Sequence, residues 1–120
     1  MNKVCLCLIL TGLLALAGAV PKLFAADKTT ITGEVIDTFC YTAAQAKGEG
    51  HRKCGLNCAA KGIPVALLED GTNKVYVLLP NKSESPVPKA AVDKMGQKAQ
   101  ITGTVYSVGG SQFLTVDSVK

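Results

Sequence analysis

Three cysteines and one histidine lie within nineteen residues of one another in the first half of the chain: Cys40, His51, Cys54 and Cys58. His51 is the only histidine in the sequence. Thiolate sulfur and imidazole nitrogen are ligands that Zn²⁺ and Cu⁺ prefer, and three sulfurs with one nitrogen complete a tetrahedral zinc site. The spacing Cys-x₁₀-His-x₂-Cys-x₃-Cys is not that of a standard zinc finger. These residues therefore predict a site for Zn²⁺ or Cu⁺ without deciding between the two metals.

A helix through the second half of this stretch would place the ligands on one face. At about 100° per residue, His51, Cys54 and Cys58 fall within about 60° of the helix circumference. The apolar side chains of the same segment lie on a separate arc: Leu56, Ala59, Ala60 and Ile63. Cys40 is expected at the end of a strand, from which it can fold back over the cysteines. Asp37 is close enough in sequence to accept a hydrogen bond from His51.

The segments around this cluster have the patterns of a small β protein. Residues 30–39 alternate as a strand does, with Ile31, Val35 and Phe39 on one face. Two hairpins are expected, 65–69 with 74–79 and 98–108 with 112–119, because turn residues separate the members of each pair. A helical insert, 41–63, follows the first strand, and a short helix, 89–95, follows the third.

This order predicts a mainly-β fold, a small five-stranded OB-like barrel with a helix between strands 1 and 2 and a short helix between strands 3 and 4. The segment Ile31-Thr32-Gly33-Glu34-Val35 is echoed by Ile101-Thr102-Gly103-Thr104-Val105. Such an echo fits two long barrel strands that bend at a glycine. Within the insert, Gly48 and Gly50 are expected to separate a first turn from a helix of about 51–61, which Gly62 ends.

The N-terminus has the three parts of a secretory signal peptide. Lys3 supplies positive charge, residues 4–20 are almost wholly apolar, and small residues near Ala25 suit a signal peptidase. We therefore expect a signal peptide, 1–25, and one OB-like domain, 26–120, periplasmic or secreted and without stable membrane insertion after cleavage. Cleavage removes two of thirteen basic residues and none of nine acidic ones. The resulting charge of +2 is too small to predict nucleic-acid binding.

Export also favours other uses of the same cysteines, because oxidising compartments promote disulfides. A disulfide between Cys40 and either Cys54 or Cys58 would stabilise a periplasmic binding or adaptor module that binds no metal, and it would leave one cysteine as a free thiol. A third hypothesis is a thiol–disulfide redox protein that uses Cys54 and Cys58. For nucleophilic catalysis by Cys54 or Cys58 with His51, the sequence identifies no oxyanion donor and no third catalytic group. We therefore expect a binding protein rather than an enzyme, with no catalytic or organic-cofactor residues.

The cysteine motif also resembles that of a group of proteins. Cys40-Tyr41, followed by His51-x-x-Cys54-x-x-x-Cys58-x-x-x-Gly62-x-Pro64, is similar to a pattern found in small exported bacterial proteins of unassigned function. The likeness extends to Thr102-Gly103-Thr104-Val105. It implies that the three cysteines and the histidine act as one unit on an OB-fold-like domain, and it implies no activity.

Together these patterns predict an exported metal-binding protein with Cys40, His51, Cys54 and Cys58 as ligands, serving metal trafficking, sensing or structural closure. The expected partners are the metal ion and, for trafficking, another periplasmic protein. Nucleic acid is not expected, because Tyr76 is the only aromatic residue on the face that OB barrels use for it.

Overall fold

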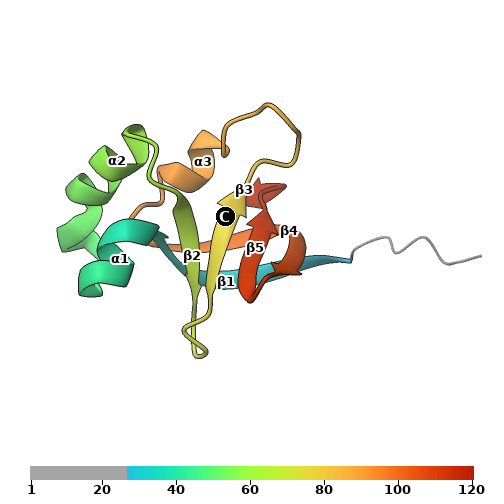
Figure 1. Cartoon of the computed structure of the whole chain (residues 1–120), viewed down its shortest axis with the longest axis horizontal. Helices are drawn as coiled ribbons and strands as arrows, with labels where there is room; N and C mark the ends of the chain where they lie inside the picture. Colours follow the sequence, from blue (N-terminus) through green and yellow to red (C-terminus); the bar gives the residue numbers. More distant parts are fainter. Residues whose placement is uncertain (1–26) are drawn as a thin grey trace, which may run out of the picture.

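The computed structural model describes residues 27–120, a barrel of strands with short helices at one end (Figure 1). The predicted signal peptide, 1–25, lies outside the described residues. In chain order the elements are β1 (Lys28–Asp37), α1 (Thr38–Ala44), a 3₁₀ turn η1 (Glu49–His51), α2 (Arg52–Ala60), β2 (Val65–Glu69), β3 (Val75–Leu79), α3 (Lys89–Val92), β4 (Lys98–Val108), β5 (Ser111–Thr115) and β6 (Ser118–Val119). None of the helices in this part of the chain is long and apolar enough to cross a membrane.

The sheet closes on itself. β1 pairs antiparallel with β2, β2 with β3, and β4 with β5, while β3 runs parallel to β5. β4 also pairs with β1, which completes the ring β1-β2-β3-β5-β4. This order, with α3 between β3 and β4, confirms the small OB-like barrel with helical inserts.

The two echoed segments lie on paired antiparallel strands and meet at their first residues. Ile31 lies opposite Ile101, and both side chains are buried. Next to them, Thr30 lies opposite Thr102, with 2.7 Å between their hydroxyl oxygens. From this isoleucine pair the two segments run in opposite directions along β1 and β4.

The glycines of the echo are required by close contact between backbones. Gly33 pairs with β2 on one side and with β4 on the other. A Cβ atom at Gly33 would collide with the carbonyl oxygen of Leu68, and one at Gly103 would collide with the carbonyl oxygen of Thr115. The absence of a side chain lets both long strands bend as they pass from one neighbour to the next.

The core fills the barrel and continues under the helices. Its buried members include apolar side chains from all five barrel strands: Ile31, Val35, Leu67, Leu78, Ile101 and Leu114. α2 packs against this core through Leu56 and Ala59, as predicted, whereas Ala60 is exposed. α1 lies beside α2 (Figure 1) and contacts a separate cluster of Ile36, Ala66 and Leu68 through Tyr41.

The first strand ends earlier than the alternating pattern predicts. β1 stops at Asp37, and α1 begins at Thr38, so the prediction that Phe39 lies on the strand face of Ile31 and Val35 is wrong. Phe39 is 63% exposed. The last predicted strand, 112–119, is also divided into β5 and β6, and the buried Val116 lies in the break.

The expected first turn of the insert is a helix that begins at Thr38, before the predicted bounds of 41–63. η1 and α2 together cover the predicted helix of about 51–61, and Gly62 follows with a φ of +91° that suits glycine. Because of this early start, α1 carries Cys40. Cys40 is therefore on a helix rather than at the end of a strand.

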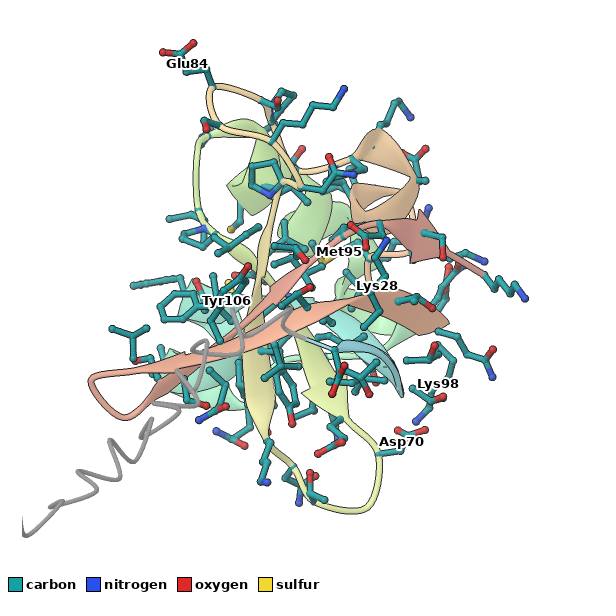
Figure 2. The ribbon with its side chains drawn as sticks, turned by 90° about the vertical axis from the view of Figure 1, so that its right-hand side faces the viewer. Lys28, Asp70, Glu84, Met95, Lys98 and Tyr106 are labelled. Atoms are coloured by element: carbon teal, nitrogen blue, oxygen red, sulfur yellow. The ribbon has the colours of Figure 1, made fainter. Side chains whose placement is uncertain are left out.

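Surface charges contribute little to this arrangement. Figure 2 shows Lys98 and Asp70 as an ion pair at the surface, with 64% and 45% of their side chains exposed. Such exposed pairs contribute about 0–1 kcal/mol. Barrel closure therefore depends on the backbone ladders and the core.

The close approach at Gly103 predicts that Gly103→Ala is destabilising. We expect the free energy of unfolding to fall by about 1–3 kcal/mol, because the new methyl group must displace backbone atoms of Thr115. Urea denaturation followed by circular dichroism measures the change. Gly50→Ala is the control, since nothing lies within 4 Å of its added Cβ. Equal stabilities for the two variants would contradict this account of the glycine.

Candidate metal centre

The site is built around a buried carboxylate. Asp37, the last residue of β1, is the one fully buried charged side chain among residues 27–120. Its Oδ1 accepts a hydrogen bond of 2.8 Å from the backbone N–H of Cys40 and so caps the N-terminus of α1. Asp37 thereby ends the strand and fixes the first turn of the helix that carries Cys40.

The second oxygen of the same carboxylate contacts His51. The Oδ2 of Asp37 lies 2.9 Å from Nε2 of His51, which confirms the predicted hydrogen bond. Burial alone would raise the pKa of Asp37, but the hydrogen bonds from the Cys40 N–H and from His51 outweigh it and hold that pKa below its ordinary value. The carboxylate is therefore ionised at neutral pH.

A glycine lets α2 approach this carboxylate. Gly55 is buried inside α2, and a Cβ at this position would lie 2.7 Å from Sδ of Met95 and 3.5 Å from Oδ2 of Asp37. Figure 2 shows Met95 within the fold. Sequence reasoning missed Gly55, although an isolated glycine inside a helical segment is a signal of close packing.

Arg52 fixes the start of α2, and sequence reasoning missed it as well. Its guanidinium donates from Nη1 to the carbonyl of Met95 at 2.6 Å and from Nη2 to the carbonyl of Asp93 at 2.7 Å. Just before η1, the backbone N–H of Gly48 donates to the carboxylate of Glu34 on β1. These contacts hold the residue before η1 to β1 and the residue after His51 to the segment between α3 and β4.

Cys40 lies at the centre of a cluster of possible ligands. Its Sγ is 3.8 Å from Sγ of Cys58. The ligand atoms of Cys40, His51 and Cys54 all lie within 4.8 Å of one another, and those of Asp37, Cys40 and Cys58 do the same. The three cysteines and the histidine therefore form a cluster that can hold a metal ion, with Asp37 beside it.

The four predicted ligands are not equally close to one another. Cys40 belongs to both groups, but neither group contains Cys58 together with His51 or Cys54. Cys54 is exposed, whereas Cys40 and Cys58 are half-buried. All three are free thiols in the structure, and the Cys40–Cys58 separation is a contact rather than the bond of about 2.05 Å in a disulfide.

The surroundings of Cys40 favour its protonated form when no cation is bound. Burial raises the pKa of its thiol to about 12, with further contributions from the Asp37 carboxylate and the Cys58 thiol. A metal cation reverses this preference, because a coordinated thiol loses its proton. The cluster is therefore arranged so that cation binding displaces a proton.

The contact between Gly55 and Met95 predicts that the substitution Gly55→Ala destabilises the protein. Gly55→Ala would stabilise an ordinary helix by about 0.8–1.0 kcal/mol. Here we expect a net loss of about 1–3 kcal/mol, since the methyl group forces α2 away from Met95. Thermal denaturation of this variant beside Asn57→Ala, an exposed position in the same helix, makes the comparison. A more stable Gly55→Ala chain would refute the proposed packing.

The Asp37 charge predicts a pH-dependent loss of stability. In the metal-free protein, Asp37→Asn should lower the free energy of unfolding at pH 7 by about 1–3 kcal/mol, because a charged acceptor is lost. The folded pKa lies below the unfolded value of 3.8. The contribution is therefore complete above about pH 4 and disappears as the pH falls through the folded pKa.

Denaturant titrations of the wild type and of Asp37→Asn, at pH values from 7 down to 2, measure the contribution of the Asp37 charge to the free energy of unfolding. Asp93→Asn is the matched control, since the side chain of Asp93 makes only an exposed pair with Lys89 and should contribute less than about 1 kcal/mol. A difference between wild type and Asp37→Asn that persists unchanged at pH 2 would be inconsistent with a charge effect.

Comparison of the chain with models of protein families, with curated proteins and with solved structures gave no match. The chemistry of the site must therefore be inferred from its own geometry. That geometry is a Cys/His cluster around Cys40 that can hold a metal ion, carried by α1, η1 and α2 on an OB-like barrel.

Proposed function

We propose that this is an exported metal-binding protein that holds Zn²⁺ or Cu⁺ with Cys40, His51, Cys54 and Cys58. The observation that carries the proposal is the position of Cys40, which lies within 4.8 Å of the ligand atoms of His51, Cys54 and Cys58. Soft sulfur ligands with one imidazole favour these two metals over Mg²⁺ or Ca²⁺, which prefer oxygen.

The spacing of two sulfurs supports a shared ion. Thiolates bound to one tetrahedral zinc at about 2.3 Å lie about 3.8 Å apart. The Sγ atoms of Cys40 and Cys58 are separated by 3.8 Å. The ligand atoms of His51 and Cys54 also lie within 4.8 Å of the Cys40 sulfur, which is thus the ligand that the two groups share.

The contact between Asp37 and His51 supports the role of the histidine. A metal-bound histidine commonly uses one ring nitrogen for the metal and donates a hydrogen bond to a carboxylate from the other. Nε2 of His51 is engaged with Asp37, so Nδ1 is the nitrogen left for a metal. Asp37 would then position the ring and contribute negative charge beside a cation.

Export would give the bound ion a second role. The predicted signal peptide would deliver three thiols into a compartment where unprotected thiols oxidise. A metal ion bound by these sulfurs would keep them from reacting. The exposure of Cys54 leaves one ligand accessible, so that the ion can enter and leave without unfolding of the barrel.

Metal content and ligand substitutions test the proposal. Protein purified without oxygen should contain about one equivalent of zinc or copper by elemental analysis, or take up one in a titration. Cys40→Ser should weaken binding by more than the roughly 10–100-fold typical of lost outer partners, because Cys40 belongs to both ligand groups.

Asn57→Ser, an exposed position on the same helix, should bind as the wild type does. Circular dichroism of each variant separates loss of a ligand from loss of fold. A folded wild-type protein that binds neither metal, or a Cys40→Ser protein with unchanged affinity, would overturn the proposal.

A further inference from the structure

The three thiols differ in depth and in their distances to one another. Cys54 is exposed, and Cys40 and Cys58 are half-buried. Cys40 lies within 4.8 Å of Cys54 and 3.8 Å from Cys58. Cys54 and Cys58 do not share a group of close ligand atoms, although both are on α2. The arrangement is a row of three sulfurs with Cys40 in the middle and one end open to solvent.

We infer from this row a second chemistry that needs no metal: thiol–disulfide exchange, in which Cys54 reacts with an external disulfide and Cys40 and Cys58 end as the internal disulfide. The inference goes beyond metal binding. It also assigns the internal pair differently from the redox hypothesis drawn from the sequence, which used Cys54 and Cys58. A disulfide between those two residues would be strained, because they are one turn apart in an intact helix.

The first step occurs at the surface. The thiolate of Cys54 attacks one sulfur of an external disulfide, R–S–S–R. A bond forms between the Cys54 sulfur and that sulfur, the R–S–S–R bond breaks, and one thiolate RS⁻ leaves. The product is a mixed disulfide at Cys54, whose solvent exposure leaves room for a bulky R group.

The next two steps move the disulfide inward. The sulfur of Cys40 attacks Sγ of Cys54, the second RS⁻ leaves with the proton that Cys40 gives up, and a Cys40–Cys54 disulfide forms. His51 belongs to the same close group and can pass that proton. The sulfur of Cys58 then attacks Sγ of Cys40, and Cys54 is released as a thiol with the proton of Cys58.

The steps balance. One external disulfide accepts two electrons and becomes two molecules of RSH, and the thiols of Cys40 and Cys58 supply those electrons as they become one internal disulfide. The reverse sequence would return the disulfide to an external thiol. Because these sulfurs are also the proposed metal ligands, a bound ion and the internal disulfide exclude each other.

Reaction of the reduced, metal-free protein with oxidised glutathione tests the inference. We expect two equivalents of glutathione to be released per chain, and peptide mapping should find the Cys40–Cys58 disulfide. A parallel reaction with insulin as the disulfide distinguishes a protein substrate from a small one. Insulin oxidising the chain in the same order would favour a protein disulfide as substrate.

Each cysteine variant should change the reaction at a different step. The Cys40→Ser protein should release one equivalent of glutathione and keep a second glutathione bound to Cys54. The Cys58→Ser protein should release two equivalents of glutathione and accumulate the Cys40–Cys54 disulfide. Cys54→Ser should slow the reaction at least about tenfold, because the exposed nucleophile is lost. Circular dichroism confirms that each serine variant is folded before it is used.

Two results would overturn the inference. One is release of two equivalents of glutathione by the Cys40→Ser protein, and the other is a Cys54–Cys58 disulfide as the product of the wild-type protein. Prior loading with one equivalent of zinc should protect all three thiols. Since the exchange reaction is run without metal, a protein that exchanges disulfides but binds neither zinc nor copper refutes only the proposed function. A protein that binds zinc but does not exchange refutes only this inference.

Discussion

The site depends on one buried carboxylate. Asp37 accepts the backbone N–H of Cys40 with one oxygen and contacts His51 with the other, so a single side chain fixes a helix start and a ring orientation. A buried ion is costly unless hydrogen bonds and opposite charge offset its loss of water. In the metal-free state the imidazole and the amide supply that compensation. A cation bound nearby would add to it.

The barrel places this carboxylate where two helices can reach it. β1 pairs with β4 from Lys28 to Glu34 and with β2 from Gly33 to Asp37, so the end that carries Asp37 is held by the ladder to β2. α1 packs on the outer cluster through Tyr41, and α2 packs on the core through Leu56. Gly55 then brings α2 close to Asp37. The positions of the sulfur atoms follow from these packing contacts and not from the cysteines themselves.

Much of the barrel could be predicted from the sequence because its signals are local. Alternation marks the strands, turn residues mark the hairpins, and the order of elements selects the topology. The residues of the candidate cluster were also recognisable, since few other side chains bind soft metals. The end of β1 was not, because alternation continues through Thr38 and Phe39. Only the capping bond of Asp37 shows that the helix begins there.

The missed contacts all join residues far apart in the chain. Arg52 reaches carbonyl groups at Asp93 and Met95, and Gly55 is small because Met95 lies against it. No local pattern contains such pairs. The differing environments of the three thiols also arise from contacts between distant residues. Helical spacing predicts that Cys54 and Cys58 share a face of α2, but it does not predict how close each of them lies to Cys40 on α1.

X-ray absorption spectroscopy at the zinc or copper edge tests the central claim most directly, because it reports the atoms bound to the ion. Protein loaded with one equivalent of zinc under anaerobic conditions should show three sulfurs at about 2.3 Å and one nitrogen at about 2.0–2.1 Å. A first shell made only of oxygen and nitrogen would contradict the claim that Cys40, Cys54 and Cys58 form the site with His51.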